Sequence, residues 1–250
     1  MKLSFTTNLW DFHQHPENWI ELFRDERVSV CTSFQYGIRR KKPDSSPYTE
    51  SDFIEVSQEF KRHIGYTPPF ISVISNENEQ WVYDHVKLAK RLGTTCRLNG
   101  VNPIGLANDY YPRYKMLRHY IRIYDLGLAD YEENTRERHR GNCPFNTCGM
   151  CSHSNRSCCV VDGKLRYSYC EDLSFLFDAY NLSTPTIDDL TKISNQITVP
   201  RECMCCKMMR ICNGCILHRF ILHRKNFKTD KYCAEMNNLY DDLKRIGFKL

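Results

Sequence analysis

The stretch that decides the fold runs Cys203-Met204-Cys205-Cys206-Lys207-Met208-Met209-Arg210-Ile211-Cys212-Asn213-Gly214-Cys215. Four of its cysteines follow the spacing Cys203-x2-Cys206-x5-Cys212-x2-Cys215. Structural cysteines scatter with the needs of packing, whereas thiolates that share a small metal centre must converge in short loops. Two close pairs of cysteines beside a glycine are therefore typical of metal ligation.

The same region holds nearly all the cysteines of the chain, because twelve of the fourteen lie between Cys143 and Cys233. Zinc could occupy the block of four, and a second zinc could take four of the remaining thiolates. Iron–sulfur clusters account for all of them more economically. The further candidate ligands are Cys143, Cys148, Cys151, Cys170 and Cys233.

Five cysteines fall outside this pattern. Cys158, Cys159 and Cys205 neighbour the candidate ligands, and we interpret them as spare thiols. Cys31 and Cys96 lie in apolar, strand-like segments, where a cysteine usually serves as a small buried hydrophobic residue.

Composition limits the classes of protein to consider. The chain has 250 residues, of which 41% are hydrophobic and 26% charged, as in globular proteins. No run approaches the length of a membrane span, and the N-terminus lacks the apolar segment of a secretory signal. We therefore expect a cytoplasmic protein without a membrane partner. Cysteines stay reduced in that compartment, which favours metal ligation over disulfides.

The net charge of +5 is modest, and two basic runs contribute to it, Arg39-Arg40-Lys41-Lys42 and residues 218–231. We expect both to be solvated loops or helix faces. Because basic and aromatic residues do not alternate strongly, we expect no nucleic-acid partner.

The first half of the chain alternates strand-like and helix-like segments. Strands are expected at 2–8, 28–34, 70–74 and 94–98, and helices after Pro16 and at 49–63, 81–92 and 112–126. Such alternation predicts βα units and a parallel sheet. Four strands cannot close a barrel, and an open edge exposes unpaired backbone groups. We therefore predict an α/β fold in which residues 1–126 form a partial, incomplete parallel β/α barrel.

The pattern changes after this point. A charged linker is expected at 127–142, followed by a small cysteine-rich α+β domain at 143–250. Asp162-Gly163 lies between two β-rich pieces, which is a strong signal for a β-hairpin. Helices are expected at 187–193 and 234–246.

Together these residues resemble a known family. Cys151, Gly163, Cys170, the block of four cysteines and Cys233 resemble the SPASM domain, the auxiliary iron–sulfur module of radical S-adenosylmethionine enzymes that modify peptides and proteins. The first half is similar to the later part of those enzymes' partial (β/α)6 barrel. Residues 3–8 resemble its third strand, and residues 96–105 resemble its last strand and the following turn.

The resemblance implies two 4Fe–4S clusters. One would be held by Cys203, Cys206, Cys212 and Cys233. The other would be held by Cys151, Cys170 and Cys215, with Cys148 or Cys143 as fourth ligand or with that position left open to substrate. Two spacings depart from the family: Cys212 and Cys215 are separated by two residues instead of three, and Gly163 lies farther from Cys170.

A third departure concerns activity. The CxxxCxxC motif that holds the cofactor-cleaving cluster of the family does not occur in these 250 residues. We therefore expect a radical S-adenosylmethionine maturase-like chain that cannot cleave S-adenosylmethionine by itself, because it is truncated, half of a split enzyme or a degenerate relative. The implied partners are a peptide or protein substrate and a separate N-terminal half, which would have to supply S-adenosylmethionine binding.

Two other functions remain open at this point. One is a non-catalytic iron–sulfur electron-transfer or scaffold subunit, and the other is a zinc-stabilised binding module. Asn8 and Asn99 lie at strand ends, on the side where parallel barrels place their sites. They could contact a cofactor in a complete enzyme, but capping of the strands is the simpler interpretation.

Overall fold

The computed structural model describes residues 3–37, 40–101, 111–137, 157–161, 164–168, 205–208, 211 and 229–248. The chain divides into two compact units, residues 1–101 with 109–137 and residues 102–108 with 138–250. Within the described ranges, no helix combines the length and the apolar character needed to cross a bilayer.

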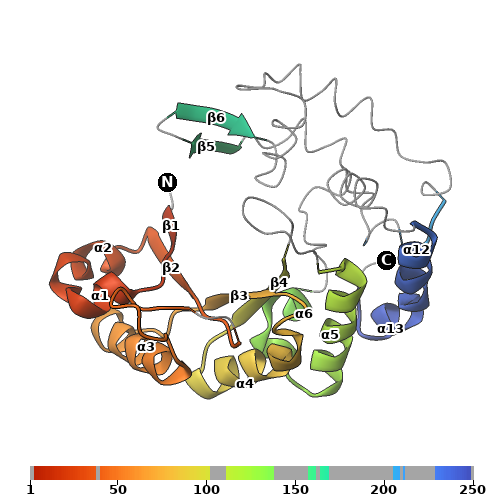
Figure 1. The fold of residues 1–250 in the computed structure, drawn as a ribbon, viewed down its shortest axis with the longest axis horizontal. Coiled ribbons are helices and arrows are strands. Elements are labelled where there is room, and N and C mark those ends of the chain that lie inside the picture. The colour runs from red at the N-terminus through yellow and green to blue at the C-terminus, as the bar shows by residue number, and fades with distance from the viewer. Residues whose placement is uncertain are drawn as a thin grey trace. The chain divides into compact units, whose positions relative to one another are not determined.

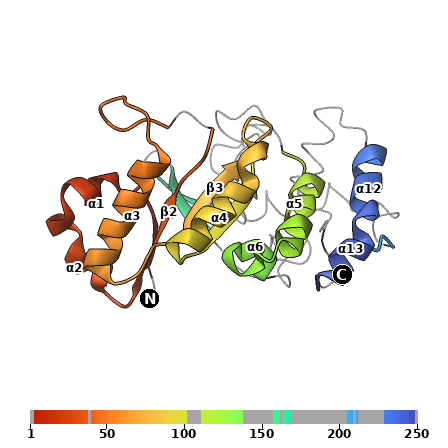
Figure 2. The same ribbon diagram turned by 90° about the horizontal axis from the view of Figure 1, so that it is seen from below.

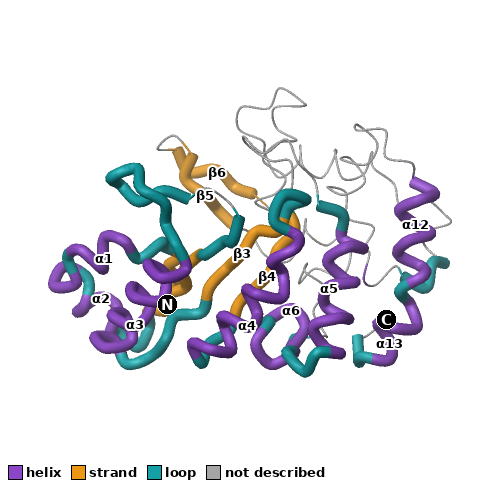
Figure 3. Tube along the Cα trace, turned by 60° about the horizontal axis from the view of Figure 1, so that its bottom comes forward, coloured by secondary structure: helices purple, strands orange, loops and turns teal. Residues whose placement is uncertain are grey.

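The first unit is built on a four-stranded sheet in the order β1-β2-β3-β4, and every neighbouring pair is parallel (Figure 1). Figure 3 colours the strands orange. The described strands do not close into a barrel. The α/β class and the parallel sheet predicted from the sequence are thus confirmed. The strands are β1 (Leu3–Thr6), β2 (Val28–Ser33), β3 (Phe70–Ile74) and β4 (Cys96–Gly100).

Helices connect successive strands, and Figures 1 and 2 show α3, α4 and α5 along the same face of the sheet. This arrangement follows from parallel strands, which need crossover connections that pack back on the sheet. The helices are α1 (Trp10–Gln14), η1 (Pro16–Asn18), α2 (Ile20–Arg24), α3 (Glu50–Ile64), η2 (Glu79–Trp81), α4 (Val82–Leu92), α5 (Arg113–Asp125), η3 (Ala129–Tyr131) and α6 (Glu133–Arg136).

Local sequence explains where the longest helix, α3, begins and ends. The Thr49 hydroxyl accepts from the Asp52 backbone N–H at 3.3 Å, and the Asp52 carboxylate accepts from the Thr49 backbone N–H at 2.7 Å. This reciprocal capping satisfies two donors that the first turn leaves unpaired. Gly65 ends the helix with φ of 99°, a left-handed conformation that favours glycine.

Aromatic side chains make up much of the core around the first two strands. Phe12, Phe23 and Phe60 are buried together, with ring centroids 5.1 to 5.9 Å apart. Phe34 and Phe53 stack at 4.6 Å. Such pairs contribute about 0.5–1.5 kcal/mol beyond the area they bury. This cluster fixes α1, α2 and α3 on the sheet.

The outer edge of β4 is closed by side chains. The Leu98 N–H donates to Glu132 Oε1 at 3.1 Å, and the Leu98 carbonyl accepts from Tyr120 Oη at 2.9 Å and Asn134 Nδ2 at 3.0 Å. Glu132 is buried, and it also accepts from the Thr135 N–H and hydroxyl at 2.6 and 2.7 Å. Burial raises the pKa of the Glu132 carboxyl, while these hydrogen bonds oppose the shift. The backbone N–H and carbonyl of Leu98 therefore have hydrogen-bond partners without a further strand.

The segment expected as a linker, 127–142, contains two of the short helices, η3 and α6. Contacts join α6 to β4 and to α5, and the first unit continues to Glu137. Glu132 lies between the two short helices, so this segment supplies the residue that closes the sheet edge.

The described part of the second unit contains a hairpin and two helices. Strands β5 (Ser157–Val161) and β6 (Lys164–Ser168) pair antiparallel on either side of Asp162-Gly163, which confirms the predicted hairpin. The helix expected at 234–246 is present as α12 (Thr229–Asn238) and α13 (Tyr240–Arg245), separated at Leu239. The expected helix at 187–193 lies outside the described residues.

Replacing Glu132 tests how the sheet ends at β4. In Glu132→Gln, one acceptor oxygen becomes an N–H₂ group that faces donors, so two or more hydrogen bonds are lost. We expect the free energy of unfolding to fall by about 1–3 kcal/mol in urea denaturation.

The matched control is Glu133→Gln, which removes a carboxylate paired with the partly exposed Arg97 at 2.8 Å. Its expected cost is below about 1 kcal/mol. An equal cost for the two substitutions would contradict a closing role for Glu132.

Candidate functional site

A cavity of about 330 Å³ lies where β1 and β2 end, within the first unit. Carboxyl ends of parallel strands are the usual ligand-binding edge of open α/β sheets. The lining residues come from the end of β1, from the end of β2 and from the loop before α3. They are Thr6, Thr7, Asn8, Trp10, Ser33, Arg40, Lys41, Lys42, Pro43 and Tyr48.

The loop that carries the basic residues is an ordered hairpin. The Tyr48 N–H donates to the Arg40 carbonyl at 2.8 Å, and the Lys42 N–H donates to the Ser46 carbonyl at 2.8 Å. Before this hairpin, Gly37 has φ of 70° and lies against the Trp81 ring so closely that a Cβ would come within 2.0 Å of it. Only glycine fits this position.

Two of the basic side chains are held in defined positions. Arg40 Nη1 donates to both the carbonyl and the hydroxyl of Ser33 at 2.9 Å. Lys42 Nζ pairs with Asp52 Oδ1 at 3.1 Å and lies 5.7 Å from the centre of the Trp10 ring. Burial lowers the pKa of the Arg40 guanidinium. The basic run 39–42 was expected to be a solvated loop, but Arg40 and Lys42 are only partly exposed.

Two residues of the pocket wall carry buried polar atoms without a hydrogen-bond partner in the described part of the chain. They are Trp10 Nε1 and the Tyr48 hydroxyl. Burial raises the pKa of Tyr48, so the hydroxyl stays protonated. Native proteins rarely leave such groups unpaired unless a ligand, a water or a functional rearrangement satisfies them.

Asn8 follows β1 and lines the pocket. Its Oδ1 accepts from the N–H of Trp10, the first residue of α1, at 3.1 Å. Asn99 pairs in register with Val73 inside β4. Asn99 is not one of the residues that line the pocket.

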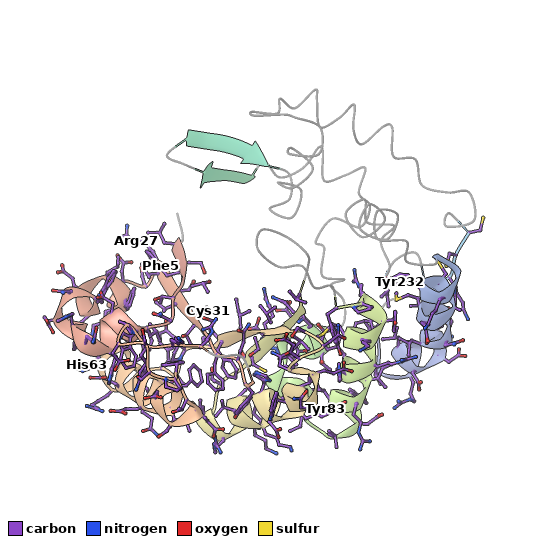
Figure 4. The ribbon with its side chains drawn as sticks, viewed as in Figure 1. Phe5, Arg27, Cys31, His63, Tyr83 and Tyr232 are labelled. Carbon is purple, nitrogen blue, oxygen red and sulfur yellow. The ribbon has the colours of Figure 1, made fainter. Side chains whose placement is uncertain are left out.

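In the second unit, two of the predicted cluster ligands come close to the same helical turn. Cys206 Sγ lies 4.0 Å from Asn237 Oδ1, and Asn237 Nδ2 donates to the Cys233 carbonyl at 2.9 Å. Next to Cys206, Lys207 Nζ lies 4.4 Å from the centre of the Tyr240 ring. These contacts place residues 205–208 beside α12 and α13; Figure 4 labels Tyr232 on α12.

The other predicted ligands cannot be placed in the same way. Cys143, Cys148, Cys151, Cys170, Cys203, Cys212 and Cys215 lie outside the described residues. Within the described ranges, no group of three or more His, Cys, Asp or Glu side chains is arranged to hold a metal ion.

The thiols outside the predicted ligand sets differ in burial. Cys96 is buried, and burial raises the pKa of its thiol well above the ordinary value. Cys31, labelled in Figure 4, is half-buried on β2, and burial raises its pKa to about 11. Cys205, interpreted as spare, is exposed.

The chain was compared with protein families, with curated proteins and with solved structures. No family model, no curated protein and no solved structure matches the chain.

A substitution of Tyr48 tests whether its buried hydroxyl lacks a hydrogen-bond partner. We expect Tyr48→Phe to leave the free energy of unfolding unchanged or to raise it by up to about 1 kcal/mol, because the hydroxyl has no partner to lose. Thermal and urea denaturation measure this effect.

The matched control is Tyr36→Phe, since the Tyr36 hydroxyl donates to Glu50 Oε2 at 2.6 Å. This substitution should lower the free energy of unfolding by about 1 kcal/mol. A clear loss of stability in Tyr48→Phe would show that its hydroxyl is already bonded in the ligand-free chain.

Proposed function

We propose that the chain is the iron–sulfur-binding part of a radical S-adenosylmethionine maturase with a SPASM-like domain. The observation that carries the proposal is the spacing of the cysteines between Cys143 and Cys233. The approach of Cys206 to the turn that begins at Cys233 supports it, because ligands from distant parts of the chain must meet at one centre.

The proposed ligands form two sets. Cys206 and Cys233 would hold one cluster together with Cys203 and Cys212. Cys151, Cys170 and Cys215 would hold the second, together with Cys148 or Cys143. Clusters of this kind carry electrons at potentials set by net charge, hydrogen bonds and exposure. In this chain, the Asn237 amide lies close enough to Cys206 to influence its sulfur.

Cleavage of S-adenosylmethionine is not proposed for this chain alone. These 250 residues lack CxxxCxxC, so the cluster that binds the cofactor would have to be held by residues outside them, such as a separate N-terminal half. Among the described strands β1 pairs only with β2, whereas the outer edge of β4 is closed at Leu98. The edge of β1 is therefore where a separate half would add a strand. The proposed substrate is a peptide or protein.

Metal loading with a chemical footprint tests the cluster assignment. We expect the anaerobically reconstituted chain to be coloured and to contain iron and acid-labile sulfide in about equal amounts. Cys206 and Cys233 should become resistant to iodoacetamide after loading, while the neighbouring Cys205 stays reactive. Mass spectrometry of the alkylated peptides measures this difference.

Serine substitutions provide the control. Cys206→Ser and Cys233→Ser should each lower the bound iron by about half, because each removes a ligand from one of two clusters. Cys205→Ser should leave the iron content unchanged. A colourless protein that contains zinc and no sulfide would replace the proposal with the zinc-stabilised module. A fully loaded, well-folded monomer would remove the need for a partner at β1.

A further inference from the structure

The pocket at the ends of β1 and β2 has an excess of positive charge that the cluster proposal does not use. Three cations line it, and Asp52 neutralises only Lys42. No carboxylate of the described residues lies within 4.0 Å of the charged groups of Arg40 or Lys41. The lining contains no acidic residue. A pocket of this kind is electrostatically complementary to an anion with about two negative charges.

The Arg40 guanidinium is fixed in position before any ligand arrives. Its Nη1 is held by the Ser33 carbonyl and hydroxyl, and its remaining N–H groups have no partner among the described residues. A planar fork whose orientation is already set binds a tetrahedral oxyanion through two parallel hydrogen bonds at little entropic cost. A bound anion would also offset the cost of holding this half-buried charge.

Neutral donors and an aromatic wall complete the site. Thr6, Ser33 and Asn8, which carry hydroxyl and amide groups, also line the pocket, and the Asn8 Oδ1 already accepts from the Trp10 N–H. The Trp10 and Tyr48 rings meet edge to face at 6.0 Å. The site thus offers cations and donors together with an apolar surface.

We propose that this pocket binds the phosphate group of a small phosphate monoester, with Arg40 and Lys41 facing the dianion and Trp10 and Tyr48 contacting the organic group. A phosphate monoester carries about −1.5 to −2 charge at neutral pH, which matches the two uncompensated cations, whereas a carboxylate would leave one of them unpaired. The volume lies at the lower end of the ~300–1,000 Å³ typical of small-molecule pockets. The proposal stands whether or not the second unit holds iron–sulfur clusters.

Isothermal titration calorimetry of the full chain, with phenyl phosphate and benzoate as probes, tests the proposal. Phenyl phosphate should bind at least about tenfold more tightly than benzoate, because only the phosphate is a dianion that pairs with both cations. Lowering the pH from about 7.5 to about 5 should weaken phenyl phosphate binding, since its second ionisation lies near pH 6. Over the same range benzoate binding should stay nearly constant, because its carboxyl group is already ionised.

Charge-matched variants separate the pocket from general electrostatics. Arg40→Gln should weaken phenyl phosphate binding by about tenfold or more, and Arg40→Lys should recover only part of the loss because it lacks the fork. Arg62→Gln, which removes an equal charge from an exposed position near the other end of α3, should have no effect. If Arg40→Gln does not fold, the exposed Lys41→Met takes its place.

Three results would overturn the proposal. They are the absence of phenyl phosphate binding, equal binding of phenyl phosphate and benzoate, and an effect of Arg62→Gln as large as that of the pocket variants. Because none of these measurements involves iron or sulfide, a failure here is distinct from a failure of the cluster assignment.

Discussion

The first unit depends on how its sheet ends at Leu98. A parallel sheet leaves unpaired backbone groups at each edge, and a buried edge strand must have them satisfied. Here the Glu132 carboxylate accepts from the Leu98 N–H, while Tyr120 and Asn134 donate to its carbonyl. Because Glu132 lies between two short helices, the segment after α5 is held against β4 and belongs to the same core. The sheet is thereby closed on one side and open, among the described strands, at β1.

The pocket of this unit lies at the carboxyl ends of the first two strands. Parallel strands bring their carboxyl ends to one edge, so short polar segments after β1 and β2 become neighbours. Gly37 lies too close to the Trp81 ring for any Cβ, and the hairpin that follows it in the sequence carries Arg40 and Lys42. What looked like a solvated basic run is thus a wall of a pocket, and the cause is tertiary packing.

The sequence predicted the elements whose causes are local and missed those whose causes are tertiary. The capping residues Thr49 and Asp52 predicted the start of α3, and the apolar run 70–74 predicted β3. Asp162-Gly163 predicted the hairpin of β5 and β6. By contrast, β4 begins two residues later than expected because Thr94 still caps α4 through its bond to the Ala89 carbonyl. The short α1 and α6 are stabilised by Phe12 packing and by Glu132, which no local pattern reveals. The pocket could not be predicted from local sequence patterns either, since its lining residues come from three separate segments of the chain.

In the second unit, cysteine spacing predicts shared metal centres, and Cys206 lies beside the turn of Cys233. Mössbauer spectroscopy of the full chain reconstituted with isotope-enriched iron and sulfide tests whether these centres form. We expect the quadrupole doublets of cubane clusters with valence-delocalised iron pairs, in an amount that matches all the protein-bound iron. Spectra of isolated ferrous or ferric thiolate sites alone, or a chain that retains no iron, would contradict this expectation.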